Sequence, residues 1–259
     1  MEIYMIHPLE HDRAVGVISA CLCMILLYFA GATPVGFVCA YLFPCLLACK
    51  TCKGVRRRLR PPGVRSFAFG FSLVLTLLFL TAFVVGLFPF ADESEKGRIS
   101  LVGVLLAPLF EELLWRGVLA DLLEPLGVLR FSVISSVCFA LLHSSPGQIC
   151  YAFVAGMIFS LALEFTDSLL PSMAAHLANN LLAALSAAAS ARVYFAVFFI
   201  SAAFALLVLL YFALFDRKTV KTLAAGFGAK HMFAAGLDPA VCLLFAALIC
   251  AAILPRLGL

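Results

Sequence analysis

Two adjacent carboxylates, Glu111 and Glu112, interrupt a long apolar stretch and are the residues best placed to do chemistry. They lie within the run Ala107-Pro-Leu-Phe-Glu-Glu-Leu-Leu-Trp-Arg-Gly117, about a dozen residues from either end of the apolar segment 99–123. As a helix, this segment places them roughly 18 Å from each end. A charge at the centre of a bilayer costs at least about 2.5–3.5 kcal/mol, so it usually marks a function or a compensating pair.

Helical spacing separates the two carboxylates. Glu112 and Arg116 are four residues apart and share a helix face, where a carboxylate and a guanidinium can pair. We therefore expect these two residues to form a structural ion pair. Glu111 points about 100° away and has no partner in its own helix. It is the stronger candidate for a catalytic role.

Two histidines lie in other apolar segments and complete the set of candidate residues. One segment ends Phe139-Ala-Leu-Leu-His143, and another contains His176-Leu-Ala-Asn-Asn180, so each histidine shares a helix face with a second motif residue. A single intramembrane histidine is often only an interhelical hydrogen-bonding group. Helix bundles also build their sites from inward side chains on facing helices. Together with Glu111, the two histidines indicate a site made by three helices.

These residues resemble a known set of motifs. Glu111-Glu112-x-x-x-Arg116, Phe139-x-x-x-His143 and His176-x-x-x-Asn180 are similar, in order and spacing, to the three signature motifs of the CPBP family of intramembrane proteases. That family, also called the Abi family, contains the type II CAAX prenyl endopeptidases. Each motif alone is weak, but their joint occurrence in separate apolar segments is specific. The resemblance covers roughly residues 100–185.

The resemblance implies a bundle of eight or so helices with a water-accessible conical cavity that opens toward the cytosol. It also implies that Glu111 activates the attacking water with the help of His143, while His176 and Asn180 stabilise the oxyanion. Peptide hydrolysis requires such a base and such donors. The supporting residues, which hold the helix and orient the base, would be Glu112, Arg116 and Phe139.

Zinc is the competing chemistry for the same residues. One glutamate and two histidines are the ligands of several catalytic zinc sites, so Glu111, His143 and His176 form an alternative Zn²⁺ ligand set. The zincin pattern HExxH is absent from the sequence, as is a GxSxG nucleophile turn. We therefore expect a reaction that uses no cofactor and no serine nucleophile.

The composition indicates that most of the chain is surrounded by lipid. Apolar residues make up 64% of the 259 residues and charged residues only 12%, whereas soluble domains have roughly half and a quarter. We expect an all-α, polytopic transmembrane helix bundle of about 8–9 spans, because a span needs roughly 20 apolar residues. The expected helices are 14–31, 35–49, 66–90, 99–123, 130–143, 149–164, 170–190, 193–215 and 238–254.

Two of the nine expected helices are short for a membrane span. Residues 130–143 would rise only about 20 Å. His143 and the Ser-Ser-Pro-Gly turn after it would then lie at membrane depth, where irregular backbone survives only inside protein or beside a wet cavity. We expect one membrane-embedded domain over 1–259, with N-terminal spans in 1–98, a CPBP-like catalytic core in 99–190 and C-terminal spans in 191–259.

The cations predict the orientation of the chain. They gather in two inter-helix segments, 50–65 and 217–230, which are separated by six expected spans and so lie on the same side. Short loops rich in Lys and Arg stay on the cytoplasmic side, which places the N-terminus inside and the acidic 92–98 loop outside. The membrane would be the plasma membrane of a prokaryote or the endoplasmic reticulum of a eukaryote. Nucleic-acid binding is not expected, since no aromatic residues interleave with these charges.

The function that fits best is an intramembrane endopeptidase acting on membrane-bound or lipidated peptides and proteins, with CAAX-like C-termini or peptide precursors as substrates. One alternative is a non-enzymatic immunity or partner-binding membrane protein that keeps the motifs for structure. A second is a proton-coupled transporter, because buried Glu and His chains also serve such pathways. Inverted repeats, which many transporters show, are not visible in the sequence.

Overall fold

The computed structural model describes residues 53–87, 101–123, 127–143 and 145–228, together with positions 35, 36, 39, 42, 45, 46, 49 and 50. Within these ranges the regular structure is entirely helical, which confirms the all-α prediction. The helices are α3 (Lys53–Arg58), α4 (Val64–Gly86), α5 (Leu101–Leu105), α6 (Ala107–Glu112), the π-helix η2 (Leu113–Val118), α7 (Leu119–Leu123), α8 (Val128–Ala140), α9 (Pro146–Thr166), α10 (Leu170–Ala188), α11 (Ala191–Phe215) and α12 (Arg217–Gly228).

Three of the described helices, α4, α9 and α11, are long and apolar enough to cross a membrane. They have 23, 21 and 25 residues, and roughly 20 are needed to span the hydrocarbon core. The expected segments 14–31 and 238–254 and much of 35–49 lie outside the described residues. The count of 8–9 spans therefore stays a prediction.

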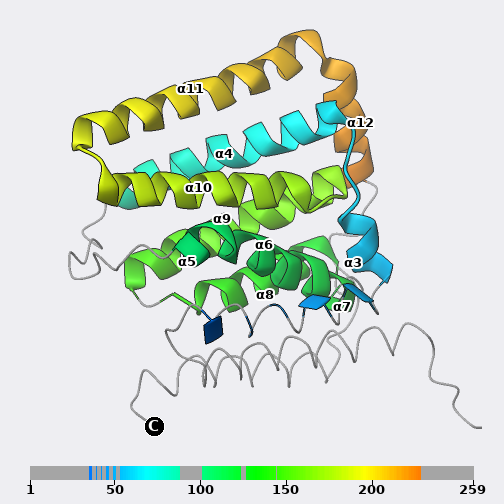
Figure 1. Cartoon of the computed structure of the whole chain (residues 1–259). Coiled ribbons are helices and arrows are strands. Elements are labelled where there is room, and N and C mark those ends of the chain that lie inside the picture. Colours follow the sequence, from blue (N-terminus) through cyan, green and yellow to red (C-terminus); the bar gives the residue numbers. More distant parts are fainter. Residues whose placement is uncertain are drawn as a thin grey trace, which may run out of the picture.

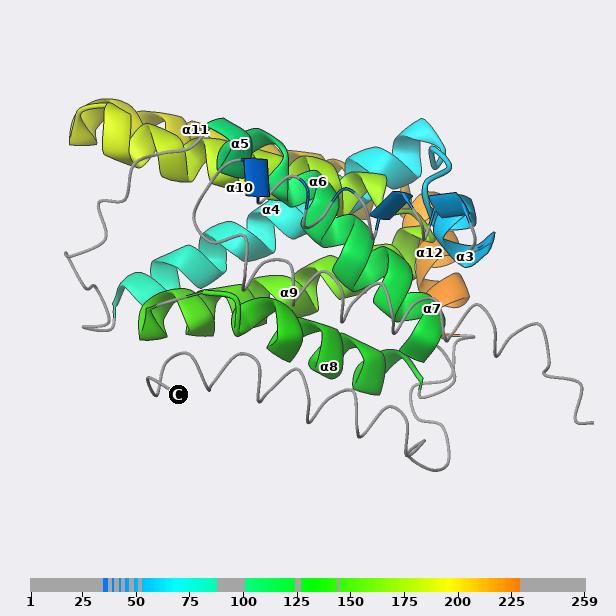
Figure 2. The ribbon, with the colours of Figure 1, turned by 60° about the horizontal axis from the view of Figure 1, so that its bottom comes forward.

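Helix α4 runs through the middle of the bundle. It contacts α9, α10 and α11, while α8 packs on the other side of α9 (Figures 1 and 2). The approach to α9 is very close at Gly70, where an added Cβ would lie 2.7 Å from Cγ2 of Thr166. Helix α11 is outermost, and Ala205 and Phe212 are its buried residues. Its exposed apolar surface is what a lipid-facing helix requires.

The segment 99–123, expected as one continuous helix, is interrupted. A turn at Leu106 separates α5 from α6, and Pro108 occupies the first turn of α6. Proline lacks an N–H and is suited to that position. The α-helical pattern then gives way to the π-helix η2 directly after Glu112. Single π-turns inside α-helices are frequent at functional sites.

Contacts with other elements hold the π-helix in place. The hydroxyl of Ser135 on α8 donates to the Trp115 carbonyl at 2.8 Å, and Nη1 of Arg58 donates to the Gly117 carbonyl at 3.4 Å. Buried carbonyls need such partners when the regular i to i−4 ladder is altered. The irregular backbone at this depth is therefore embedded in protein.

The expected short helix before His143 is present. Helix α8 ends at Ala140, and α9 begins at Pro146 with Ser145 as its N-cap. The backbone N–H of Gln148 donates to the Ser145 hydroxyl oxygen at 3.3 Å, the usual side-chain cap of a helix start. His143 thus follows directly on a helix of 13 residues.

Both basic segments lie at the same end of the bundle, where α3 and α12 are found in both views (Figures 1 and 2). Arg65 pairs with Asp216 at 3.5 Å, and Arg57 pairs with Asp167 at the same distance. Their position on one side is the arrangement that the charge pattern predicts. The acidic 92–98 loop and the N-terminus lie outside the described residues.

The segment 216–230, expected as a break between helices, contains helix α12. The apolar residues Val220, Leu223 and Phe227 recur at helical spacing. Asp216 caps this helix, because its carboxylate accepts the Thr219 hydroxyl at 2.9 Å and the Thr219 N–H at 3.3 Å. The hydrogen bond from the Thr219 side chain lowers the pKa of the Asp216 carboxyl. Because its basic residues lower its hydropathy, this helix was not predicted as an apolar span.

Candidate active site

Glu112 is the centre of a buried charge cluster. Its Oε1 accepts a hydrogen bond from Nη1 of Arg116 at 3.2 Å and lies 3.0 Å from Nδ1 of His176. The side chains of Glu112 and Arg116 are fully buried. The ion pair expected from their spacing is therefore present, and a histidine from α10 joins it.

His176 lies between the two carboxylates. Its Nε2 is 3.7 Å from Oε2 of Glu111, while Nδ1 faces Glu112. An ionised carboxylate only accepts hydrogen bonds, so the contact with Glu112 assigns a hydrogen to Nδ1. Nε2, the nitrogen that faces Glu111, is then the one left to contact a substrate or water.

The two carboxylates differ in exposure. The side chain of Glu111 is 14% exposed and that of Glu112 is 0% exposed. Glu112 is neutralised by Arg116, whereas the ion pair that the described residues give Glu111 is the longer contact with His176. A water molecule can reach Glu111 more readily. The geometry therefore distinguishes a structural carboxylate from one that is available for chemistry.

Arg116 lies against aromatic rings as well as against Glu112. Its Cζ is 4.6 Å from the ring centroid of Phe139. Its Nε and Nη2 have no hydrogen-bond partner among the described residues. A ring face can offset part of the cost of burying a guanidinium. Phe139 also contacts His176 edge to face at 5.6 Å, so this motif residue supports both members of the cluster.

His143 lies at the edge of the cluster. Its Nδ1 is 3.2 Å from the Phe139 carbonyl, and its ring meets the Phe139 ring edge to face at 5.2 Å. A carbonyl only accepts, so Nδ1 carries the hydrogen and Nε2 is the possible acceptor. His143 also interacts electrostatically with Glu111. It thus lies near Glu111, the predicted base.

Asn180 contacts α5 instead of the charge cluster. Its Nδ2 lies 3.5 Å from the Gly103 carbonyl of α5, one helical turn beyond His176. The neighbouring Asn179 accepts a hydrogen bond from the Tyr151 hydroxyl at 2.6 Å. The structure brings Glu111, Glu112, Arg116, Phe139 and His176 together, and it places Asn180 against α5. Its role at the oxyanion stays a prediction.

The alternative zinc ligand set does not form a cluster. In the part of the chain that the structure describes, no three His, Cys, Asp or Glu side chains lie close enough to share a metal ion. Glu111 and His176 approach each other, while His143 is turned toward the Phe139 carbonyl. As they stand, the three residues do not fit a zinc site.

A comparison with protein families identifies the segment that holds these residues. Residues 98–182 match the family described as type II CAAX prenyl endopeptidase Rce1-like. The matched segment contains all three motifs and coincides with the stretch that carries the resemblance. These residues form an Rce1-like domain. The predicted family membership is thereby confirmed, and because this is a protease family, hydrolase chemistry is supported in general terms.

No curated protein and no solved structure matches the chain. The Rce1-like domain comprises α5 to α9 and most of α10. Its family and the apolar helices together indicate an integral membrane protein.

Phe159 is a residue of the Rce1-like domain that the motifs do not contain. Its ring stacks on that of His176 with centroids 4.8 Å apart and planes 22° apart, and its centroid is 5.4 Å from Cζ of Arg116. Phe159 is 1% exposed. It therefore fixes the plane of the His176 ring. The chain has 25 phenylalanines, so no sequence signal distinguishes this one.

Gly156, one turn before Phe159, makes room for the charge cluster. A Cβ at this position would lie 2.6 Å from Nη2 of Arg116 and 2.8 Å from Oγ of Ser136. Such distances are far below ordinary contact, so one of the neighbours would have to move. The absence of a side chain here lets the guanidinium lie against α9. The sequence shows only a small residue in an apolar helix.

Proposed function

We propose that the chain is an intramembrane endopeptidase that hydrolyses peptide bonds in membrane-associated substrates, such as CAAX-like C-termini or peptide precursors. One observation carries the proposal. A histidine lies between a neutralised, fully buried carboxylate and a partly exposed one, inside an Rce1-like domain surrounded by apolar helices. A base held this close to a hydrogen-bond donor can activate water beside a group that stabilises the developing oxyanion.

In the proposed reaction, Glu111 takes a proton from water while the water oxygen attacks the carbonyl carbon of the scissile bond. His143 assists this step. The carbonyl oxygen becomes negative, and His176 and Asn180 stabilise it. The bond between carbon and nitrogen then breaks, and the proton held by Glu111 passes to the leaving amine. Water has thereby added OH to one product and H to the other.

Glu112, Arg116 and Phe139 act as positioning residues in this proposal. The Glu112 carboxylate holds Nδ1 of His176 and leaves Nε2 directed toward Glu111. Arg116 balances the charge of Glu112 by pairing with it. Such fixed neighbours favour a reactive geometry without reorganisation during the reaction.

The decisive experiment compares cleavage of a quenched-fluorescence CAAX peptide, farnesylated and unmodified, by the wild type and by Glu111→Ala in nanodiscs. We expect the wild type to cleave and Glu111→Ala to lose cleavage by at least about 100-fold. Asp216→Asn is the matched control, because it removes a carboxylate at the far end of α11 and should leave turnover unchanged.

The outcomes separate the alternatives. Cleavage that survives in Glu111→Ala would remove this residue from the mechanism. A well-folded wild type that cleaves neither the CAAX peptides nor peptide precursors would favour a non-enzymatic immunity or partner-binding protein. Proton flux into liposomes that depends on Glu111 would instead favour a transporter. Cleavage of the farnesylated peptide alone would define the substrate as lipidated.

A further inference from the structure

A cavity lies at the basic end of the bundle, away from the candidate active site. It encloses about 600 Å³ between α3, the start of α8, the end of α9 and α12, within the size range of small-molecule sites. Thr166, on its wall, is seven residues from Phe159, or about 10 Å along α9. The cavity is therefore a separate site from the His176 cluster.

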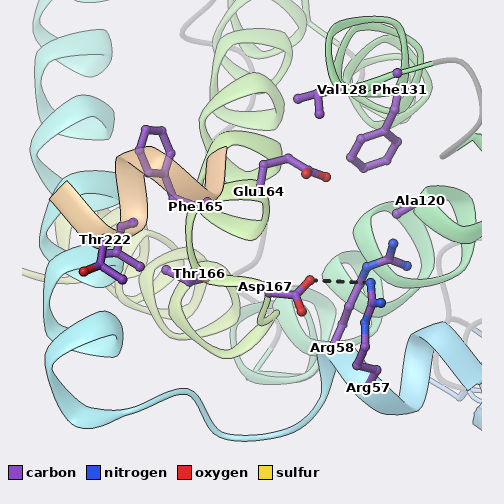
Figure 3. Close-up of a pocket in the computed structure, with 13 residues that line it drawn as sticks. Arg57, Arg58, Ala120, Val128, Phe131, Glu164, Phe165, Thr166, Asp167 and Thr222 are labelled. Carbon is purple, nitrogen blue, oxygen red and sulfur yellow. Dashed lines mark ion pairs between the residues drawn. The ribbon is translucent and has the colours of Figure 1, made fainter. Parts of the chain in front are cut away.

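The cavity carries charges of both signs (Figure 3). Arg57 and Arg58 come from α3, while Glu164 and Asp167 come from the end of α9. Arg57 pairs with Asp167 at 3.5 Å. Arg58 is only 4% exposed, and Figure 3 shows its guanidinium beside Ala120 with the Glu164 carboxylate across the space. The formal charges of these four side chains cancel.

The remaining wall is largely apolar and is partly made by α12. Its apolar side chains are those of Ala120, Val128, Phe131, Phe165 and Leu223, and two glycines and two threonines complete it. Phe227 of α12 stacks on Phe165 with ring centroids 4.5 Å apart, which holds α12 against α9. A ligand that fits must therefore combine both charges with an apolar part.

The position of the cavity at the end of α9 indicates that it lies near the membrane surface. Helix α9 has 21 residues and rises about 31 Å, close to the hydrocarbon thickness of about 30 Å. Glu164 lies in its last turn and Asp167 directly follows it. Helix α12 has a basic face and an apolar face, as do helices that lie in the headgroup region. A bilayer spanned by α9 would place the cavity at headgroup level.

We propose that this cavity binds the headgroup of phosphatidylethanolamine. The lipid phosphate would lie at Arg57 and Arg58, and its primary ammonium would donate hydrogen bonds to Glu164 and Asp167. The glycerol and the start of an acyl chain would lie against Phe131 and Leu223. This proposal does not depend on peptidase activity.

The same contacts discriminate against other phospholipids. Phosphatidylglycerol has a phosphate but no cation, so it would leave both carboxylates facing a negative headgroup. Phosphatidylcholine has a cation without N–H donors, so the carboxylates would lose their charge-assisted hydrogen bonds. Together, the hydrogen bonds to the two carboxylates contribute enough to give about a tenfold preference.

The test measures which lipid the full-length protein retains. Nanodiscs with equal mole fractions of the three phospholipids are diluted into detergent, and the bound lipids are quantified by native mass spectrometry. We expect one phosphatidylethanolamine per chain, retained about tenfold more than either of the others. Glu164→Gln should reduce its preference over phosphatidylcholine to about threefold, because Asp167 still accepts from the ammonium.

Two glycines of α12 provide a matched steric pair. Gly226 lines the cavity and Gly228 does not, and an added Cβ at either position meets nothing within 4 Å. Gly226→Trp should lower retention of phosphatidylethanolamine about tenfold, whereas Gly228→Trp should leave it unchanged. Equal retention of all three lipids, preferential retention of phosphatidylglycerol, or no effect of both Glu164→Gln and Gly226→Trp would overturn the proposal.

Discussion

Glu111 and Glu112 are adjacent in sequence, yet their surroundings give them different expected roles. Glu112 is held by Arg116 and His176, and its side chain is fully buried. Glu111 contacts only the far nitrogen of His176 among the ion pairs that the structure describes, and its side chain is partly exposed. The difference can be measured, because removing the charge of Glu112 should lower stability, whereas removing the charge of Glu111 should abolish cleavage.

We expect Glu112→Gln to destabilise the folded protein by about 3–5 kcal/mol, because it leaves the buried guanidinium of Arg116 without its counter-charge. Glu111→Gln should change stability by less than about 1 kcal/mol while abolishing cleavage. The measurement is the midpoint of thermal unfolding in detergent for both variants. Equal midpoints for the two would contradict the division of roles.

Phe159→Leu should lower kcat about tenfold with little change in KM, because the ring that stacks on His176 is lost and the imidazole can rotate. The pH dependence of kcat should shift as well, since a purely structural residue would leave it unchanged. Phe153→Leu, on the same helix but outside the cluster, is the control. An unaltered pH profile in Phe159→Leu would show that the residue only packs.

Peptidase activity should survive prolonged treatment with a metal chelator. In the described part of the chain, His143 is directed toward a carbonyl and does not join Glu111 and His176 as a ligand. Cleavage of the CAAX peptide after chelation and desalting is the measurement. Loss of activity that zinc restores would establish the metal-dependent alternative.

At the level of secondary structure, the π-helix and the glycine before Phe159 determine how Arg116 reaches Glu112. Arg116 lies within η2, and its guanidinium occupies the space that a side chain at Gly156 would fill. The charge cluster thus depends on the fit between η2 and α9. Substitution of the glycine tests this fit without touching a charged residue.

Gly156→Ala should destabilise the protein by about 1–3 kcal/mol, because overpacking of a tight interface costs that much. Gly86→Ala is the matched control at the end of α4, where an added Cβ meets nothing within 4 Å. It should be neutral or stabilise by up to about 1 kcal/mol. Unfolding in detergent would be compared for both. A stable Gly156→Ala protein would mean that Arg116 can move aside.

The sequence predicted α8 and α9 within a few residues because apolar runs and the Ser-Pro-Gly turn mark their ends. It did not predict the interruption of 99–123, since apolar composition is the same in an α-helix, a π-helix and a proline-delimited turn. Helix α12 was missed because its Arg and Lys residues lower its hydropathy. The motifs identified most of the cluster, while Phe159 and Gly156 depend on interhelical packing that one sequence does not encode visibly.

The whole molecule is polarised, with both described basic segments at one end of the bundle. The positive-inside rule places this end in the cytoplasm. That orientation would put the proposed lipid site in the cytoplasmic leaflet.

A protease recognition site inserted at Asp216 should be cut only from the cytoplasmic face of sealed vesicles. One inserted at Ser190 should be cut only from the other face, because the 25 residues of α11 separate the two positions. The measurement is the fragment pattern in inside-out and right-side-out vesicles. The reverse pattern would invert the orientation, and cutting of both sites from one face would show that α11 does not cross.

The π-helix also constrains how the chain length can change. An α-helix turns by about 100° per residue, so deleting one residue between Glu112 and Gly117 would rotate everything that follows by that amount. Arg116 would move from the i+4 to the i+3 position relative to Glu112, which changes the geometry of their ion pair, and the Gly117 carbonyl would turn away from Arg58. The number of residues in this stretch therefore sets how the part of the Rce1-like domain before it is rotated relative to the part after it. Insertions and deletions should therefore be far rarer here than substitutions in any lineage that keeps the cluster.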